Sequence, residues 1–227
     1  MTGNAVVWIF VSIGVLLLLL LLLLGISQWF WRKGDACVVL RVERDAETGA
    51  VIEIVDAACE EGLPHTTDAR TIRMTEAVWA SERRSNVLTH ERVHLDQKAH
   101  ERDWEAFYER AWEYTLSVTP PPSLVLSHRL RPNPDTAAKP WALWRSRWLF
   151  FPEAVLGNRL KDAPVRVWDT QEAVECAPPP EWNAFFCGSR GCPHQYEHPH
   201  EISAEMITGG SDSEAATRLF TWRNSIH

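Results

Sequence analysis

The sequence lacks any stretch rich in lysine and arginine. Its 23 basic side chains are outnumbered by 30 acidic ones, which gives a formal net charge of −7. Proteins that bind DNA or RNA usually carry a basic patch or run that neutralises phosphates. We therefore do not expect nucleic acid among the partners of this protein.

Cysteine is scarce, and its pattern is irregular. The chain has five cysteines, an odd number, and they are widely scattered: Cys37, Cys59, Cys176, Cys187 and Cys192. Small secreted domains held together by disulfides usually have an even number of cysteines at regular spacings. The pattern argues against such a scaffold and agrees with a domain in the cytoplasm.

Charge is absent from residues 5–26, which include nine consecutive leucines. As a helix rising about 1.5 Å per residue, this segment would span about 33 Å, close to the hydrocarbon thickness of a bilayer. Trp8 near one end and Trp29 and Trp31 near the other are placed like interfacial aromatic residues. A cleaved signal peptide would normally show a basic start, a shorter apolar region and a clear cleavage site. We predict one transmembrane helix, with the lipid bilayer as its partner along residues 5–26.

The charges beside this segment predict its orientation. No lysine or arginine precedes it, whereas Arg32 and Lys33 follow it directly. Positively charged residues collect on the cytoplasmic side of membrane proteins. The sequence therefore predicts a single-pass membrane protein with residues 1–33 as its anchor and the remaining chain in the cytoplasm.

Residues 34–227 show neither an internal repeat nor a convincing linker, so they are predicted to form one domain. Residues 37–43 and 50–55 are rich in β-branched side chains, and residues 45–49 between them have the composition of a turn. Residues 70–74 add a possible third strand. We predict a small antiparallel sheet ahead of the first helix.

The segment after this sheet contains the pattern His90-Glu-Arg-Val-His94. Ser85 or Asn86 can cap the start of a helix over this segment. Residues four apart share one face of a helix, so the two histidines can bind one metal ion. Glu91 lies beside them and can take a proton from water at an open coordination position.

A second helix is predicted from residues that repeat at helical spacing: Trp104, Phe107, Tyr108, Ala111, Trp112 and Thr115. Their common face favours packing into the core, and the prolines at 120–122 end the helix. Glutamates at 101, 105, 109 and 113 form a row along it. Each could be a third metal ligand, although such rows usually face solvent.

Residues 120–180 are rich in proline and tryptophan and have no clear periodicity. Residues 131–136 have the composition of a turn, and residues 165–168 predict one short strand. Trp141, Trp144 and Trp148 are interpreted as buried anchors or as a wall of a cleft.

Further candidate ligands crowd into residues 187–205. In one interpretation, Cys187 and Cys192 hold a separate structural zinc with two of the histidines that follow, which stand unusually close behind the cysteines. In the other, Pro199 begins a helix on which Glu201 and Glu205 share a face. One carboxylate then binds the metal held by the histidine pair, and the other orients a ligand.

The His90-Glu-Arg-Val-His94 pattern and the later Glu201-Ile-Ser-Ala segment together resemble the zincin metallopeptidases, specifically the gluzincin type. The surrounding residues are also similar to uncharacterised metallopeptidases of microbes and large DNA viruses. The resemblance implies that His90, His94 and Glu201 bind Zn²⁺ and that Glu91 is the general base. Arg92 departs from the family pattern, which usually has an uncharged residue at that position.

The implied function is hydrolysis of peptide bonds in a peptide or protein substrate by a membrane-anchored zinc metallopeptidase. Zinc would polarise the scissile carbonyl, and Glu91 would pass a proton from water to the leaving amine. A group that stabilises the oxyanion is also expected. The candidates for it are His128, Tyr196, His198 and His200.

The predicted fold class is α+β. An N-terminal transmembrane helix is followed by a single zincin-like domain, residues 34–227, with a small antiparallel sheet and an active-site helix. Two alternatives to the peptidase remain open at this point. One is a non-catalytic, membrane-tethered zinc-binding or interaction protein, and the other is a small structural zinc module at residues 187–200.

Overall fold

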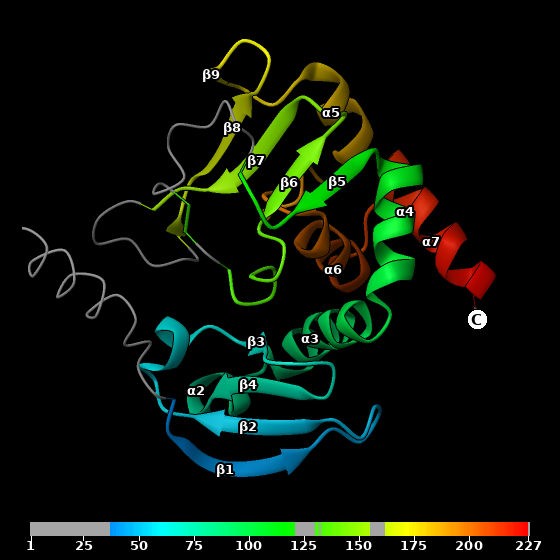
Figure 1. Cartoon of the computed structure of the whole chain (residues 1–227). Helices are drawn as coiled ribbons and strands as arrows, with labels where there is room; N and C mark the ends of the chain where they lie inside the picture. The colour runs from blue at the N-terminus through cyan, green and yellow to red at the C-terminus, as the bar shows by residue number, and fades with distance from the viewer. Residues whose placement is uncertain (1–36, 121–129, 132, 155–161, 227) are drawn as a thin grey trace, which may run out of the picture. The chain divides into compact units, whose positions relative to one another are not determined.

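The structure is a computed structural model that describes residues 37–120, 130–131, 133–154 and 162–226 (Figure 1). Val38–His227 form one unit of the chain. Two sheets lie in this unit, and the helices between and beside them carry the candidate site.

The first sheet has the strand order β1-β2-β4-β3. Its strands are β1 (Val39–Arg44), β2 (Val51–Val55), β3 (His65–Thr66) and β4 (Thr71–Thr75). β1 and β2 form an antiparallel hairpin, whereas β2 and β4 run parallel. The connection from β2 to β4 contains the short 3₁₀ helix η1 (Cys59–Gly62) and the edge strand β3.

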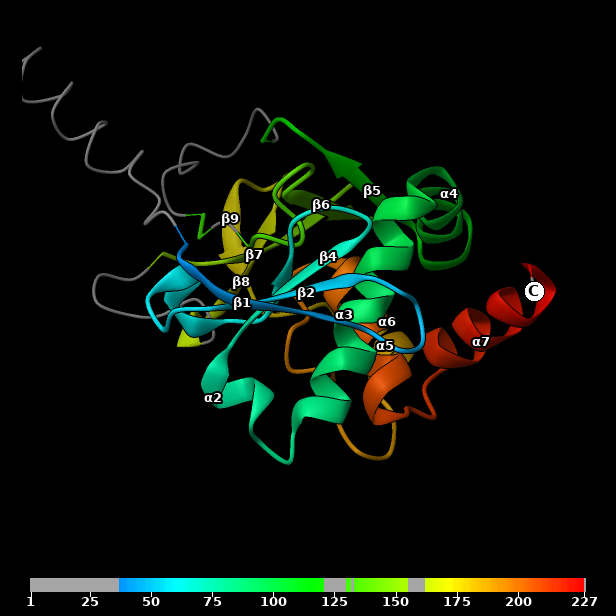
Figure 2. The same ribbon diagram turned by 90° about the horizontal axis from the view of Figure 1, so that it is seen from below.

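Two helices follow the sheet and cover one of its faces (Figures 1 and 2). α2 (Glu76–Trp79) begins directly after β4, where the Thr75 hydroxyl accepts a hydrogen bond from the backbone N–H of Val78. α3 (Arg84–Ala99) buries Leu95 against the alternating apolar residues of β2 and β4. The predicted cap at Ser85 or Asn86 is wrong, because the helix already begins at Arg84.

The second sheet is antiparallel with the strand order β5-β6-β7-β8-β9. Its strands are β5 (Tyr114–Ser117), β6 (Trp141–Trp144), β7 (Trp148–Pro152), β8 (Val165–Asp169) and β9 (Val174–Cys176). β6 and β7 are joined by three residues, of which Arg145 and Ser146 have positive φ, and the Arg147 N–H donates to the Trp144 carbonyl over 3.0 Å. The short strand predicted at residues 165–168 is therefore confirmed, but as one of five.

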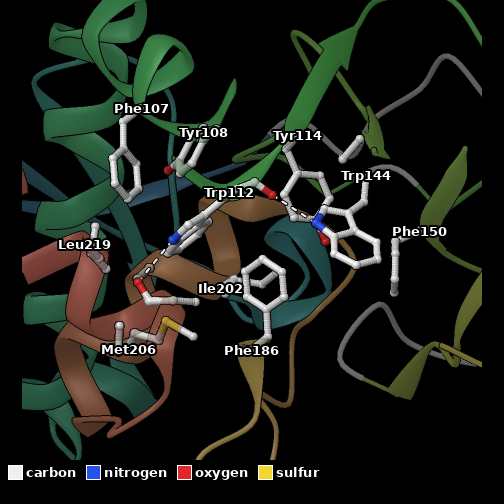
Figure 3. Close-up of a cluster of buried hydrophobic side chains, with 14 of the residues drawn as sticks. Phe107, Tyr108, Trp112, Tyr114, Trp144, Phe150, Phe186, Ile202, Met206 and Leu219 are labelled. Carbon is white, nitrogen blue, oxygen red and sulfur yellow. Dashed lines mark hydrogen bonds between the residues drawn. The ribbon is translucent and has the colours of Figure 1, made fainter. Parts of the chain in front are cut away.

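One face of this sheet packs on four helices: α4 (Glu101–Trp112), α5 (Pro180–Phe186), α6 (Pro199–Gly209) and α7 (Glu214–Ile226). The core between them is largely aromatic (Figure 3). The buried indole N–H groups are satisfied: Trp112 donates to the Ala215 carbonyl, and Trp144 donates to the Trp112 carbonyl. Aromatic rings therefore fill this core without leaving those polar groups unpaired.

The predicted aromatic helix is confirmed as α4, but its end is not. α4 stops at Trp112, where Glu113 takes a left-handed conformation with φ of 60°, and Thr115 already belongs to β5. The helical spacing of Thr115 was therefore fortuitous. Two members of the glutamate row, Glu101 and Glu105, pair with Lys139, and none of the row reaches the candidate site.

The predicted fold class is wrong in two respects. The described residues form two sheets, and the first of them is mixed where a small antiparallel sheet was predicted. Among residues 37–226 as described, no helix is both long enough and apolar enough to cross a membrane. The predicted transmembrane segment, residues 5–26, lies outside the described residues, and the predicted single-pass placement is contradicted for the part of the chain that is described.

The cysteine interpretation also needs correction. Cys187 and Cys192 form a disulfide, Cys37 and Cys59 are disulfide-bonded as well, and Cys176 is free. Disulfides persist mainly in oxidising compartments, so these bonds speak against the predicted cytoplasmic location. They also remove Cys187 and Cys192 as thiolate ligands, which excludes the separate cysteine zinc module.

Candidate metal centre

The site is built where α3 and α6 pack against each other. α3 presents His90 and His94 on one face, one helical turn apart. α6 begins with Pro199 at its first position, and the His198 ring accepts a hydrogen bond from the backbone N–H of His200 as its N-terminal cap. Glu201 lies in this first turn, where the helix dipole favours a negative charge.

Three side-chain atoms of these helices converge on one point. The His90 Nε2 and His94 Nε2 atoms are 3.0 Å apart. Glu201 Oε2 lies 3.2 Å from His90 Nε2 and 3.4 Å from His94 Nε2. His94 and Glu201 are buried, and His90 is partly exposed, so the group is open on one side.

These spacings suit a single small metal ion. Ligand atoms about 2.0–2.1 Å from one ion lie about 3.0 Å apart at right angles and about 3.4 Å apart at tetrahedral angles. All three measured separations fall in that interval. His90, His94 and Glu201 form a group that could hold a metal ion.

Hydrogen bonds fix the orientation of two of these side chains. Gln97 Oε1 accepts a bond of 2.7 Å from His94 Nδ1, so the His94 Nε2 lone pair points into the group. Asn133 Nδ2 donates to Glu201 Oε1 over 2.9 Å, which leaves Oε2 directed at the histidines. The Gln97 amide is itself anchored by Ser203 Oγ on α6 at 2.9 Å.

No protein-family model, curated protein or solved structure matches the chain. The function has to be inferred from the chemistry of the site itself.

Glu91 is buried beside the three converging atoms. Its side chain is 3% exposed, and its Oε2 atom has no hydrogen-bond partner among the described residues. Burial raises the pKa of Glu91 well above its usual value, and the charge of Asp135 adds to the rise, whereas His94 opposes it. A buried carboxylate oxygen without a hydrogen-bond partner destabilises the fold, and such groups are typical of functional sites.

The carboxylates around His90, His94 and Glu201 favour the binding of a positive charge. Burial opposes a charged His94, yet the carboxylates of Glu201 and Asp135 outweigh it and raise the pKa of His94 to about 10. Burial likewise acts to raise the pKa of Glu201, but His94 and His90 hold it well below its usual value. Burial and the charge of Glu201 raise the pKa of Glu197 to about 8. A divalent cation would neutralise this acidic surrounding better than a proton on one histidine.

A cleft of about 670 Å³ opens onto the group. His90, Glu91 and Glu201 line it from below. From α2 to the start of α3 its lining includes the apolar Val78 and Val87 together with the polar Ser81, Arg83 and Asn86. Further polar residues line the same cleft: Asn133, Asp135, His194, Gln195 and Glu205.

Of the four candidates for oxyanion stabilisation, the three that the structure describes do not line this cleft. His128 lies outside the described residues. Tyr196 packs against Phe150 and Trp182 in the aromatic core, and His198 is committed to its capping role and to the Lys139 carbonyl. His200 lies against Tyr108 and borders a different cavity.

Sequence reasoning missed the residues that support the site. Asn133 comes from residues 131–136, which were predicted only to form a turn, and Gln97 lies about one helical turn after His94 on α3. His194 was considered as a ligand, but it lies on the cleft wall, where Glu205 accepts hydrogen bonds from the backbone N–H groups of His194 and Gln195. The only available signal was the i, i+3 spacing of His94 and Gln97.

Proposed function

We propose that this chain is a zinc-dependent metallopeptidase in which His90, His94 and Glu201 hold the metal and Glu91 acts as general base. The observation that carries the proposal is the vacant, buried Oε2 atom of Glu91 beside the three ligand atoms. A metal held only for structure needs no unpaired carboxylate next to it.

The donor set favours zinc among the metals. Two imidazole nitrogens and one carboxylate oxygen, with one side open, are a typical catalytic zinc set. The same three donors also serve iron in oxygenases. Glu91 favours zinc, because a buried base is needed for hydrolysis rather than for oxygen chemistry.

Zinc, when bound, supplies a Lewis acid that polarises a carbonyl group and makes a water molecule more acidic. Glu91 then accepts the proton of that water and delivers it to the leaving nitrogen of the peptide bond. Gln97 and Asn133 keep His94 and Glu201 in their orientations during this exchange. The burial of Glu91 suits this role, because a carboxyl group with a raised pKa can return the proton it has taken.

The cleft supports a peptide substrate. Its volume of about 670 Å³ lies in the range that admits a ligand of several residues. Val78 and Val87 in its lining can contact an apolar side chain, and polar lining residues such as Gln195 can bind the peptide backbone. Because Glu91 lines the same cleft, a substrate bound there would lie close to it.

The decisive experiment measures metal content and peptide cleavage on the same preparations. The purified chain should contain zinc and cleave members of a quenched-fluorescence peptide library. The Glu91→Gln variant should keep its zinc and lose at least about 10²-fold of the activity. His94→Ala should lose both zinc and activity.

Glu109→Gln is the matched control, because it makes the same substitution at an exposed position on α4. It should leave zinc and activity unchanged. Zinc in the wild type without any cleavage across the library would instead indicate the non-catalytic zinc-binding protein. Iron in place of zinc, or equal activity of the wild type and Glu91→Gln, would refute the proposal.

A further inference from the structure

β1 is an edge strand of the first sheet, so backbone N–H and C=O groups along its outer side lack a neighbouring strand among the described residues. β1 pairs with β2 on one side only, and no described residue pairs with its other side (Figures 1 and 2). The apolar residues of β1 and the valine before it are exposed: Val38 58%, Val39 40%, Leu40 57% and Val42 58%. An exposed apolar edge strand is a template for pairing with another strand.

The pairing with β2 determines which backbone groups face outward. Asp45 N donates to the Ala50 carbonyl, so Asp45 and Ala50 are a hydrogen-bonded pair that continues the register of the hairpin. In an antiparallel ladder such pairs alternate along the strand. Arg41 and Glu43 therefore bond to β2, whereas the N–H and C=O groups of Val42 point to the open edge.

We propose that β1 pairs with β1 of a second copy of this chain, antiparallel and centred on Val42. The outward groups of Val42 would then bond to those of Val42 in the other copy. The result is one continuous sheet across a two-fold axis, which is the symmetry of most homodimers.

Charge selects this register among the possible ones. Arg41 pairs with Glu43 and Glu76 of its own chain. With Val42 opposite Val42, each Arg41 also lies directly opposite a Glu43 of the other copy. A shift of the partner strand by two residues in one direction places Arg41 opposite Arg41, and in the other direction it places Glu43 opposite Glu43. Unlike charges directly opposite stabilise an antiparallel pair, and like charges destabilise it.

The first experiment tests the register by cross-linking the full chain. All variants carry Cys176→Ser, which removes the free thiol, and a mild detergent keeps the apolar run at residues 5–26 in solution. Val42→Cys should form a disulfide-linked dimer on oxidation, because paired residues have Cα atoms about 5.5 Å apart. Leu40→Cys should give only the background level, because two such residues would stand about four residues apart along the strands.

The second experiment tests the charges. Arg41→Glu should raise the dissociation constant of the dimer about tenfold, because two attractive pairs become repulsive. Adding Glu43→Arg to the same chain should restore the wild-type dissociation constant. Val42→Lys should abolish the dimer, whereas the uncharged Val42→Thr should retain it. Thermal unfolding of each variant shows whether the domain itself stays folded.

The proposal fails if the wild type is monomeric in sedimentation at every concentration tested, or if it binds a different protein through β1 but not itself. It also fails if Leu40→Cys cross-links as well as Val42→Cys. If the dissociation constant of the dimer is unchanged by Arg41→Glu and Val42→Lys, another surface holds the dimer together, and the proposal is likewise refuted.

Discussion

At the scale of single residues, the charged Arg92 has a structural role outside the candidate metal site. It lies between Glu91 and Val93, but its side chain points away from the site and pairs with the β1–β2 turn. Its guanidinium donates to both carboxylate oxygens of Asp45, at 2.6 and 2.9 Å. This ion pair therefore links α3, which carries His90 and His94, to the first sheet.

This contact predicts a stability that depends on pH. Burial alone would raise the pKa of Asp45, but hydrogen bonds from Arg92 and Thr48 outweigh it and lower the pKa from 3.8 to about 2. A lowered pKa in the folded state stabilises the fold above pH 3.8, and that contribution is lost as the pH falls through 2. Asp45→Asn should reduce the free energy of unfolding by about 2 kcal/mol at pH 7.

Denaturant unfolding at several pH values measures this. The difference between the wild type and Asp45→Asn should shrink between pH 4 and pH 2, because protonated Asp45 and asparagine are both neutral. Glu47→Gln is the control, since Glu47 also pairs with Arg92 but its side chain is 69% exposed. It should cost less than about 1 kcal/mol. A constant difference down to pH 2 would show that the Asp45 charge does not stabilise the fold.

The same scale shows what the sequence could predict of the site. The histidine pair follows from local spacing, because four residues always make about one helical turn. Glu201 came from a pattern on a second helix, which is again a local feature. Asn133 and Gln97 support the site through contacts between segments that are distant in sequence. Local sequence patterns do not predict such contacts. The sequence therefore predicted the candidate ligands but not the residues that orient them.

At the scale of elements, whether a strand could be predicted from the sequence depended on how its residues are buried. β2 alternates between buried and half-buried residues, and its strand character was predicted. β7 is buried along nearly its whole length, so alternation was absent and the segment was not recognised as a strand. The parallel pairing of β2 and β4 was missed because β4 follows an irregular connection rather than a crossover helix.

The aromatic core between α4, α5 and the second sheet is expected to contribute strongly to stability (Figure 3). Phe186 is fully buried, and its ring stacks on Trp182 at 4.8 Å and meets Trp112 edge-on at 5.3 Å. Phe186→Ala leaves a cavity among rigid rings that cannot close around it. It should cost about 3–5 kcal/mol in the free energy of unfolding.

The neighbouring Phe185 provides the matched control. It is only partly buried and lies against the Arg218 guanidinium at 4.9 Å. Phe185→Ala should cost much less in the same denaturant titration. Equal costs for the two variants would contradict the view that α5 is anchored through Phe186.

At the scale of the whole molecule, the candidate metal joins distant parts of the chain. His90 and Glu201 are 111 residues apart in sequence and lie on different helices. Without a cation, the carboxyl groups of Glu91, Glu201 and Asp135 lie close to one another, with His94 and Lys98 as positive charges beside them. The metal should therefore stabilise the fold as well as support catalysis.

Chelation tests this expectation. A site filled at about a thousand times its dissociation constant adds about 4 kcal/mol to the free energy of unfolding. For a domain of this size, the corresponding fall in Tm on metal removal is on the order of 10 °C. Zinc should restore the Tm of the chelated protein, whereas magnesium should not, because it prefers sites made only of oxygen ligands.

His90→Ala is the control that separates the site from general effects of the chelator. It removes one ligand at a partly exposed position, so the domain should still fold, but with the lower Tm of the metal-free wild type. Chelator should then change its Tm very little. If chelator lowers the Tm of the wild type and of His90→Ala equally, the stabilising metal is bound elsewhere; if it lowers neither, α3 and α6 are held together by packing alone.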